Sequence, residues 1–313
     1  MGQPSAVVLL GAQRFDPNLK AAVAALRVQG RVALITAGWQ ERESEDEELV
    51  AHLGGETVNL RLHERGEQVF ASDPELRAAH RERQDLLRHV QDFYRIRLEH
   101  LREAERTIAQ RAAPPEIHDD EARASVAAIR ELDLRHLANC ARLHAGFEER
   151  FGLGTRASVA RHREEIAEAV RGCGAVAIAG GHVASLINRL ALFGIGRLLD
   201  GKAVFAWSGG AMAVSDRVVL FHDDPPQGPS VSEVLDAGLG LVPGVVVLPQ
   251  PEQRLQLGDP QRVRRLVHRF LPARCLALPS RSRVTWRGGK LGQADGVVEL
   301  LPDGSNAPLR SAA

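Results

Sequence analysis

The chain has 313 residues, of which 44% are hydrophobic and 26% charged, and its 40 basic and 40 acidic side chains leave no formal net charge. This composition favours a soluble globular protein without a nucleic-acid or membrane partner, because no whole-molecule charge attracts either and no apolar stretch reaches the ~18 to 20 residues that cross a bilayer. The N-terminal apolar run ends at Gly11, which is too early for a signal peptide. The three cysteines are widely separated in sequence and form neither a disulfide framework nor a zinc motif. We therefore expect a cytoplasmic protein without a metal or organic cofactor.

Residues 1–73 alternate short apolar runs with amphipathic segments, which is typical of a parallel sheet covered by helices. The pattern predicts strands over residues 6–10, 31–36 and 57–62 and helices over residues 18–26 and 45–53. We interpret residues 1–73 as the first part of an α/β domain.

Residues 74–150 follow a different pattern, with a narrow apolar stripe at steps of three and four on each side of Pro114 and Pro115. The spacing predicts a long antiparallel helical hairpin inserted into the α/β domain, and a first helix of about 37 residues would span ~55 Å. Two narrow apolar stripes that bury one another leave little apolar surface to pack against the main core. We therefore expect the hairpin to form a homodimer interface or a lid. Six histidines of this segment have no metal-ligand spacing and are expected at the solvated surface: His80, His89, His100, His118, His136 and His144.

Residues 151–313 return to the α/β rhythm and are interpreted as the second part of the domain. Helices are expected over residues 158–170 and 185–192, and strands over residues 175–179 and 202–207. Later strands are expected over 239–247, 275–278, 283–286 and 297–301, with the last two paired across the Gly288-Gly289 turn.

The strand that ends at Trp207 leads into Ser208, Gly209 and Gly210, which is the pattern of a nucleophile elbow. A serine on a sharp strand-to-helix turn needs small neighbours, and the N–H of Gly209 would then point to where an oxyanion develops. The alternative is an ordinary strand-Gly-Gly-helix turn with Ser208 as the N-cap. Gly180 and Gly181 end the preceding strand, so both loops are expected at the carboxyl edge of the sheet, where ligands bind.

Four segments resemble the dipeptidase E and cyanophycinase family of serine peptidases, within the class I glutamine amidotransferase-like superfamily: Gly180-Gly181-His182, Trp207-Ser208-Gly209-Gly210-Ala211, Leu239-Gly240-Leu241-Val242-Pro243 and Leu278-Pro279. The resemblance covers about residues 5–62 and 156–303. It implies a flavodoxin-like, mostly parallel sheet with helices on both faces, Ser208 as nucleophile, and hydrolysis of a small peptide or isopeptide bond.

The resemblance also implies that Gly180 and Gly181 help to form the oxyanion hole and that Asp223, fifteen positions after the serine, is the acidic residue. His182 replaces the family's Asn or Asp. The family's histidine and glutamate have no counterpart, because the chain reads Pro249-Gln250-Pro251 and Leu278-Pro279-Ser280 at those places.

A serine hydroxyl needs a positioned base, whose help contributes ~10²- to 10⁴-fold. His182 on the glycine loop or His222 beside Asp223 could supply it; the alternatives are a helix-capping loop residue for His182 and a strand-ending residue for His222. Two functions follow: a serine peptidase-like hydrolase with an altered triad, or a degenerate relative that binds a small ligand or serves assembly. Either protein would bind a small peptide-like or acidic molecule. We expect an acidic molecule if the arginine-rich stretch 254–274 lines the pocket; the alternative is that this stretch forms a solvated helix surface.

Overall fold

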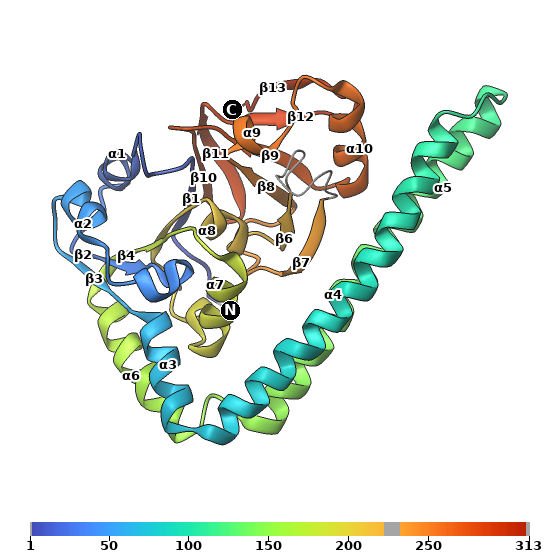
Figure 1. Ribbon diagram of the computed structural model, residues 1–313. Helices are drawn as coiled ribbons and strands as arrows, with labels where there is room; N and C mark the ends of the chain where they lie inside the picture. Colours follow the sequence, from blue (N-terminus) through green and yellow to red (C-terminus); the bar gives the residue numbers. More distant parts are fainter. Residues whose placement is uncertain (1, 222–231, 311–313) are drawn as a thin grey trace.

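The computed structural model describes residues 2–221 and 232–310 of the chain. Its centre is a seven-stranded sheet in the order β11-β10-β1-β5-β4-β2-β3 (Figure 1). Five of these strands are parallel neighbours: β1 (Ala6–Leu10), β2 (Arg31–Ile35), β3 (Thr57–Asn59), β4 (Cys173–Ile178) and β5 (Ala203–Trp207). The antiparallel strands β10 (Arg283–Arg287) and β11 (Lys290–Asp295) extend the edge next to β1.

Helices cover both faces of this sheet, as the alternation along β1 demonstrates. Val7 and Leu9 belong to one core cluster, whereas Val8 and Leu10 belong to another on the opposite face. The second cluster includes residues of α1 (Leu19–Ala25) and α2 (Glu47–Leu53); the first includes residues of α3 (Leu62–Ser72), α6 (Ala157–Arg171), α7 (Val183–Leu192) and α8 (Gly209–Ala213). The predicted α/β class, with a mostly parallel sheet and helices on both faces, is confirmed.

The C-terminal part forms a second layer of short strands. A four-stranded sheet has the order β13-β12-β9-β8, and a two-stranded ribbon pairs β6 with β7. The bounds are β6 (Arg217–Leu220), β7 (Glu233–Ala237), β8 (Val245–Pro249), β9 (Arg274–Leu278), β12 (Val298–Leu300) and β13 (Asn306–Pro308), with helices α9 (Pro251–Arg254) and α10 (Pro260–Phe270) and the 3₁₀ turns η1 (Ala37–Arg42) and η2 (Ile195–Arg197).

One predicted pairing is wrong. The Gly288-Gly289 turn joins β10 to β11, whereas the strand near residue 298 pairs with β9 in the other sheet. Sequence adjacency across the turn favours the shorter connection, and the polar strand β11 had no apolar run to reveal it.

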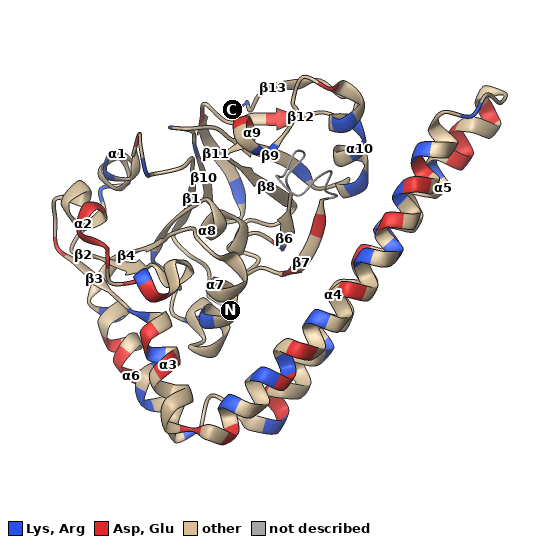
Figure 2. Ribbon diagram, in the orientation of Figure 1, with Lys and Arg blue, Asp and Glu red and all other residues tan. Residues whose placement is uncertain are grey.

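The helical hairpin consists of α4 (Pro74–Ala109) and α5 (Pro115–Phe151), of 36 and 37 residues. Both helices start with a proline at the first helical position, and the pair projects beyond the body of the molecule at its far end (Figure 1). Basic and acidic side chains alternate along most of its length, as expected for solvated helix faces (Figure 2).

A buried polar cluster fastens the hairpin to the C-terminal part. The guanidinium of Arg269 on α10 donates to both carboxylate oxygens of Asp133 on α5, at 2.8 and 2.7 Å, and to the hydroxyl of Tyr94 on α4 at 2.8 Å. All three side chains are buried. The Tyr94 hydroxyl also accepts the N–H of Val234 on β7 at 3.0 Å, so four elements meet at this cluster.

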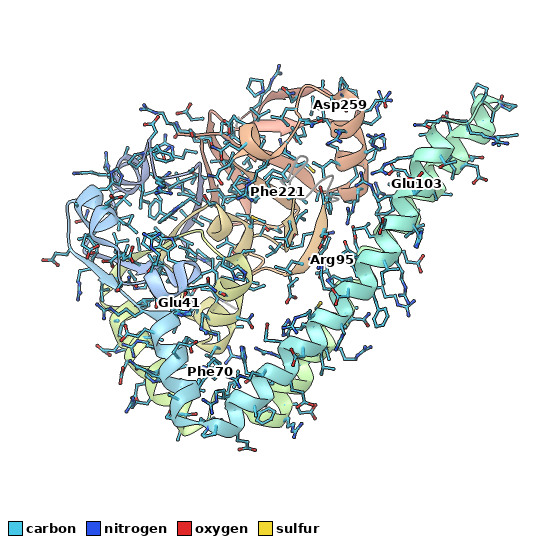
Figure 3. All side chains as sticks on the ribbon, viewed as in Figure 1. Glu41, Phe70, Arg95, Glu103, Phe221 and Asp259 are labelled. Atoms are coloured by element: carbon cyan, nitrogen blue, oxygen red, sulfur yellow. The ribbon has the colours of Figure 1, made fainter. Side chains whose placement is uncertain are left out.

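A second line of contacts follows β7, where Arg95, which Figure 3 labels on α4, binds Glu233 at 2.7 Å. The expectation of solvated histidines fails here. His136 is buried against the Tyr94 ring, and His144 lies 2.7 Å from Asp236. The reason is that one face of α5 docks on β7 over this stretch, which a sequence pattern for an isolated hairpin does not reveal.

Candidate functional site

Ser208 sits between the end of β5 and the start of α8 with φ 50° and ψ −127°. A non-glycine residue in this region carries strain of the order of 1–3 kcal/mol, which the surrounding structure must hold in place. The side chain is partly exposed, and its hydroxyl forms no hydrogen bond within the described residues. The turn therefore presents a free hydroxyl at the rim of the sheet.

The glycine loop after β4 packs directly against this turn. A Cβ on Gly180 would lie 2.6 Å from the Ser208 Cβ and 3.0 Å from the Gly209 nitrogen. Likewise, a Cβ on Gly210 would lie 2.2 Å from the carbonyl oxygen of Ile178. Glycine at these positions lets the two loops approach each other, so the elbow and the glycine loop form one site.

A third loop joins the site from β2, and sequence reasoning missed it. The carbonyl of Gly38 accepts the N–H of His182 at 2.7 Å, and a Cβ on Gly181 would lie 2.3 Å from that oxygen. Two residues on, Gln40 has φ 56° and ψ −124°, nearly the same strained conformation as Ser208. A glycine soon after an apolar strand, at Ala37-Gly38, was the one signal in the sequence that could have found it.

The three loops leave the carboxyl ends of neighbouring strands β2, β4 and β5. The chain leaves β2 toward β3 on one side and leaves β4 toward β5 on the other, so the direction of the connections reverses between β2 and β4. In open α/β sheets, ligands bind outside the carboxyl ends of the strands at such a switch point. Ser208 lies one strand away from it.

His182 is the N-cap of α7, and one of its ring nitrogens forms hydrogen bonds within the first turn of this helix. Its Nδ1 accepts the N–H of Ser185 at 3.2 Å and lies 2.8 Å from the Ser185 hydroxyl, which in turn accepts the Gln40 amide at 3.0 Å. An Nδ1 that accepts an N–H is unprotonated, so the neutral ring carries its hydrogen on Nε2. In the described part of the chain, no hydrogen bond joins this imidazole to Ser208.

The other predicted residues are placed as follows. His222 and Asp223 lie outside the described residues. Trp207 is buried at the end of β5, with its backbone beside Leu10 of β1. Gln250, at the place of the family's histidine, follows β8 in the left-handed conformation, with φ 56° and ψ 51°.

One buried carboxylate follows the third loop. Glu43 accepts the N–H of Glu64 at 2.9 Å and so supports the start of α3. Burial raises the pKa of this carboxyl, although hydrogen bonds from the backbone of Glu64 and His63 oppose the shift. Its contacts serve the helix rather than the elbow.

The arginine-rich stretch 254–274 is mostly engaged in structural contacts. Arg269 binds Asp133, Arg274 binds Glu299 through two hydrogen bonds of 2.7 Å, and Arg264 donates to the carbonyl of Asp303. Arg262 and Arg265 line a cavity of about 160 Å³ together with Arg102 and Arg106 of α4. These arginines lie on α10 and the hairpin and not at the elbow.

Among residues 2–221 and 232–310, no group of three or more His, Cys, Asp or Glu side chains could hold a metal ion. The same residues include no helix with the length and apolar character needed to cross a membrane.

No family model and no curated protein matches the chain. A solved structure described as "Crystal structure of a peptidase from an acI-B1 Actinobacterium" is similar, with 13% sequence identity and a TM-score of 0.49 over 100% of this chain and 96% of that chain. So distant a likeness says nothing about activity.

Proposed function

We propose that this protein is a serine hydrolase of the peptidase-like kind, which cleaves a small peptide or isopeptide bond with Ser208 as nucleophile. The observation that carries the proposal is the backbone of Ser208: a strained residue at the end of a central strand, partly exposed, with a hydroxyl free of hydrogen bonds in the described structure. Strain of this kind persists where the fold holds it, and such residues cluster at active sites.

The oxyanion would be stabilised by backbone N–H groups beside the serine. Gly209 begins α8, and the first N–H groups of a helix have no acceptor within the helix. Its nitrogen lies against Gly180, where a Cβ would come within 3.0 Å. We therefore assign the N–H of Gly209 and that of Gly181 to the oxyanion hole, where each well-placed donor contributes a factor of ~10² to 10³.

The base that takes the serine proton is an imidazole, for which the sequence offers His182 and His222. His182 in its neutral form offers an Nε2–H, which suits donation to an oxyanion or a bound anion better than removal of the serine proton. His222 with Asp223 is then the other pair that the sequence offers for the base and its orienting carboxylate.

Two observations support a second function, in which the site binds a ligand without cleaving it. The His182 Nδ1 caps α7, and Gln250 stands where the resembling family has its histidine. Without a base the site would bind a small peptide-like or acidic ligand in a pocket of backbone N–H groups without cleaving it, as a degenerate relative would.

The experiment that separates the two functions is labelling with a fluorophosphonate probe. We expect the folded wild type to be labelled and Ser208→Ala to be unlabelled, because only an activated serine reacts with such a probe. Ser125→Ala, at a serine of the hairpin whose hydroxyl binds the Glu121 carbonyl, is the matched control and should label like the wild type.

The proposal is wrong if the wild type stays unlabelled under conditions that label a known serine hydrolase. Labelling of wild type that persists in Ser208→Ala would place the reactive group elsewhere. Loss of labelling in His222→Ala but not in His182→Ala would assign the base to His222.

A further inference from the structure

A cavity of about 390 Å³ lies between the base of the hairpin and the body of the α/β domain. Its walls come from α4, α5 and the turn after it, α7, the last residue of α8, and the end of β7 with the two residues that follow. This volume is within the range of small-molecule sites, about 300–1,000 Å³. The cavity is separate from the elbow: α7 and α8 both begin beside Ser208, and the residues that line the cavity lie farther along these helices.

One wall holds a buried cation that forms no ion pair with a carboxylate among residues 2–221 and 232–310. Arg83 of α4 is 9% exposed and lies over the ring of Phe147, 4.0 Å from its centroid. Its Nη2 lies 3.1 Å from the Asn188 amide oxygen and 3.0 Å from Nδ1 of His80, whereas its buried Nε–H has no partner within the described residues. A guanidinium taken out of water with unused donors is costly unless an anion compensates it.

The facing walls carry the opposite charge. Asp236, at the end of β7, lies 2.7 Å from Nε2 of His144 and accepts the N–H of Ala237 at 2.8 Å, and Glu148 of α5 also lines the cavity. Burial lowers the pKa of the Arg83 guanidinium to about 10, while the charges of Asp236 and Glu148 act to raise it. Both carboxylates therefore interact electrostatically with the Arg83 guanidinium.

The remaining surface of the cavity is apolar. Phe147, Leu153, Ile187, Leu190 and Leu239 supply most of it. A ligand that fits must therefore combine a negative group, a positive group close to it, and an apolar body.

We propose that this cavity binds a free α-amino acid with an apolar side chain. Its carboxylate accepts hydrogen bonds from Arg83, and its ammonium group lies against Asp236 and Glu148. Its side chain packs against Phe147 and the leucines. This site is independent of the proposed hydrolase function, since no lining residue belongs to the elbow.

Isothermal titration calorimetry of the full-length protein tests the inference with three probes. L-Leucine carries both charges, isocaproate lacks the ammonium group, and isoamylamine lacks the carboxylate. We expect saturable binding of one leucine per chain and binding of either analogue about tenfold more weakly or worse, because each analogue leaves one set of charged partners unpaired.

The variants locate the site. Arg83→Met should weaken leucine binding about tenfold or more, while Arg88→Met, at an exposed arginine of the same helix that pairs with Asp85, should not change it. Ser208→Ala should bind leucine like the wild type, which separates this inference from the hydrolase proposal.

No saturable heat with leucine, binding of either analogue as tight as that of leucine, or undiminished affinity in Arg83→Met would each overturn the proposal. If Arg83→Met does not fold, Arg83→Lys takes its place, and the comparison of the three probes on the wild type decides by itself.

Discussion

At the scale of single residues, the site depends on glycines that let three loops meet. Gly180 touches the Ser208 turn, and Gly38 and Gly181 touch each other's backbone. The strained conformations of Ser208 and Gln40 are held on either side of this contact. The turn that carries the Ser208 hydroxyl is thus held by backbone packing that leaves no room for a Cβ.

Gly180→Ala tests this packing. The new Cβ would meet the Ser208 Cβ and the Gly209 backbone, neither of which is a flexible side-chain end, so we expect the free energy of unfolding to fall by about 1–3 kcal/mol. Urea denaturation measures it. Gly172→Ala is the control, since its nearest neighbour would be 3.7 Å away and its φ is −75°. Equal stability of the two variants would contradict the close packing.

At the scale of secondary-structure elements, the junction between α3 and α4 determines where the hairpin starts. Asp73 caps α4 by accepting the N–H of Leu76 at 3.0 Å, and it also accepts the Ser158 hydroxyl and two N–H groups of Arg156. Pro74 then begins the helix. This one carboxylate joins the start of the hairpin to the start of α6.

The hydrogen bonds from Arg156 lower the pKa of the Asp73 carboxyl from its ordinary value of 3.8, with further lowering by Leu76 and Ser158. A lowered pKa means that the stabilisation is present at neutral pH and is lost as the pH falls below about 4. We expect Asp73→Asn to lower the free energy of unfolding by about 1–3 kcal/mol at pH 7 and by progressively less in acid.

Urea denaturation across this pH range checks the prediction. The control is Glu75→Gln, at a carboxylate that binds the same Arg156 but is 74% exposed, and it should change stability little. A constant difference between wild type and Asp73→Asn from pH 7 to pH 3 would show that Asp73 is not charged in this role.

The Arg269–Asp133–Tyr94 cluster fastens the middle of the hairpin to α10. Removal of one partner leaves a buried charge uncompensated, so we expect Asp133→Leu and Arg269→Met each to cost about 3–5 kcal/mol. The double variant should cost less than the sum, because it removes both charges. Strictly additive losses in denaturant titrations would mean that the two groups do not act as a pair.

At the scale of the whole molecule, the hairpin is a long arm of which only one stretch docks on the body. Six large apolar side chains are strongly exposed among the described residues, and five of them lie on the hairpin: Leu86, Phe93, Ile96, Ile117 and Leu134, between 44% and 65% exposed. The body buries its apolar residues in clusters on both sides of the central sheet. The arm is therefore the surface with apolar area left to bury.

We expect a homodimer that forms through this arm, because burial of exposed apolar surface favours association at about 25 cal/mol per Å². Size-exclusion chromatography with light scattering measures it. Phe93→Ser with Ile96→Ser should shift the protein toward monomer, whereas Glu99→Ser with His100→Ser, at exposed polar positions of the same helix, should not. A wild type that is monomeric at every concentration would show that the arm has another use.

The sequence by itself determined the elements whose signals are local. The alternation in residues 1–73 predicted the α/β class, the apolar stripes on each side of Pro114-Pro115 predicted the hairpin, and the strand that ends at Trp207 predicted the strand-to-helix turn. These signals are local because periodicity and steric demands act over a few residues.

Only the tertiary structure decided what those elements face. The meeting of Gly38 with Gly181, the burial of His136 against Tyr94 and the cavity around Arg83 each join residues that are far apart in the chain. No periodicity records such pairs, because the partner comes from another element. Whether a histidine is solvated, caps a helix or binds a carboxylate is decided by packing between elements and by the desolvation that this packing imposes.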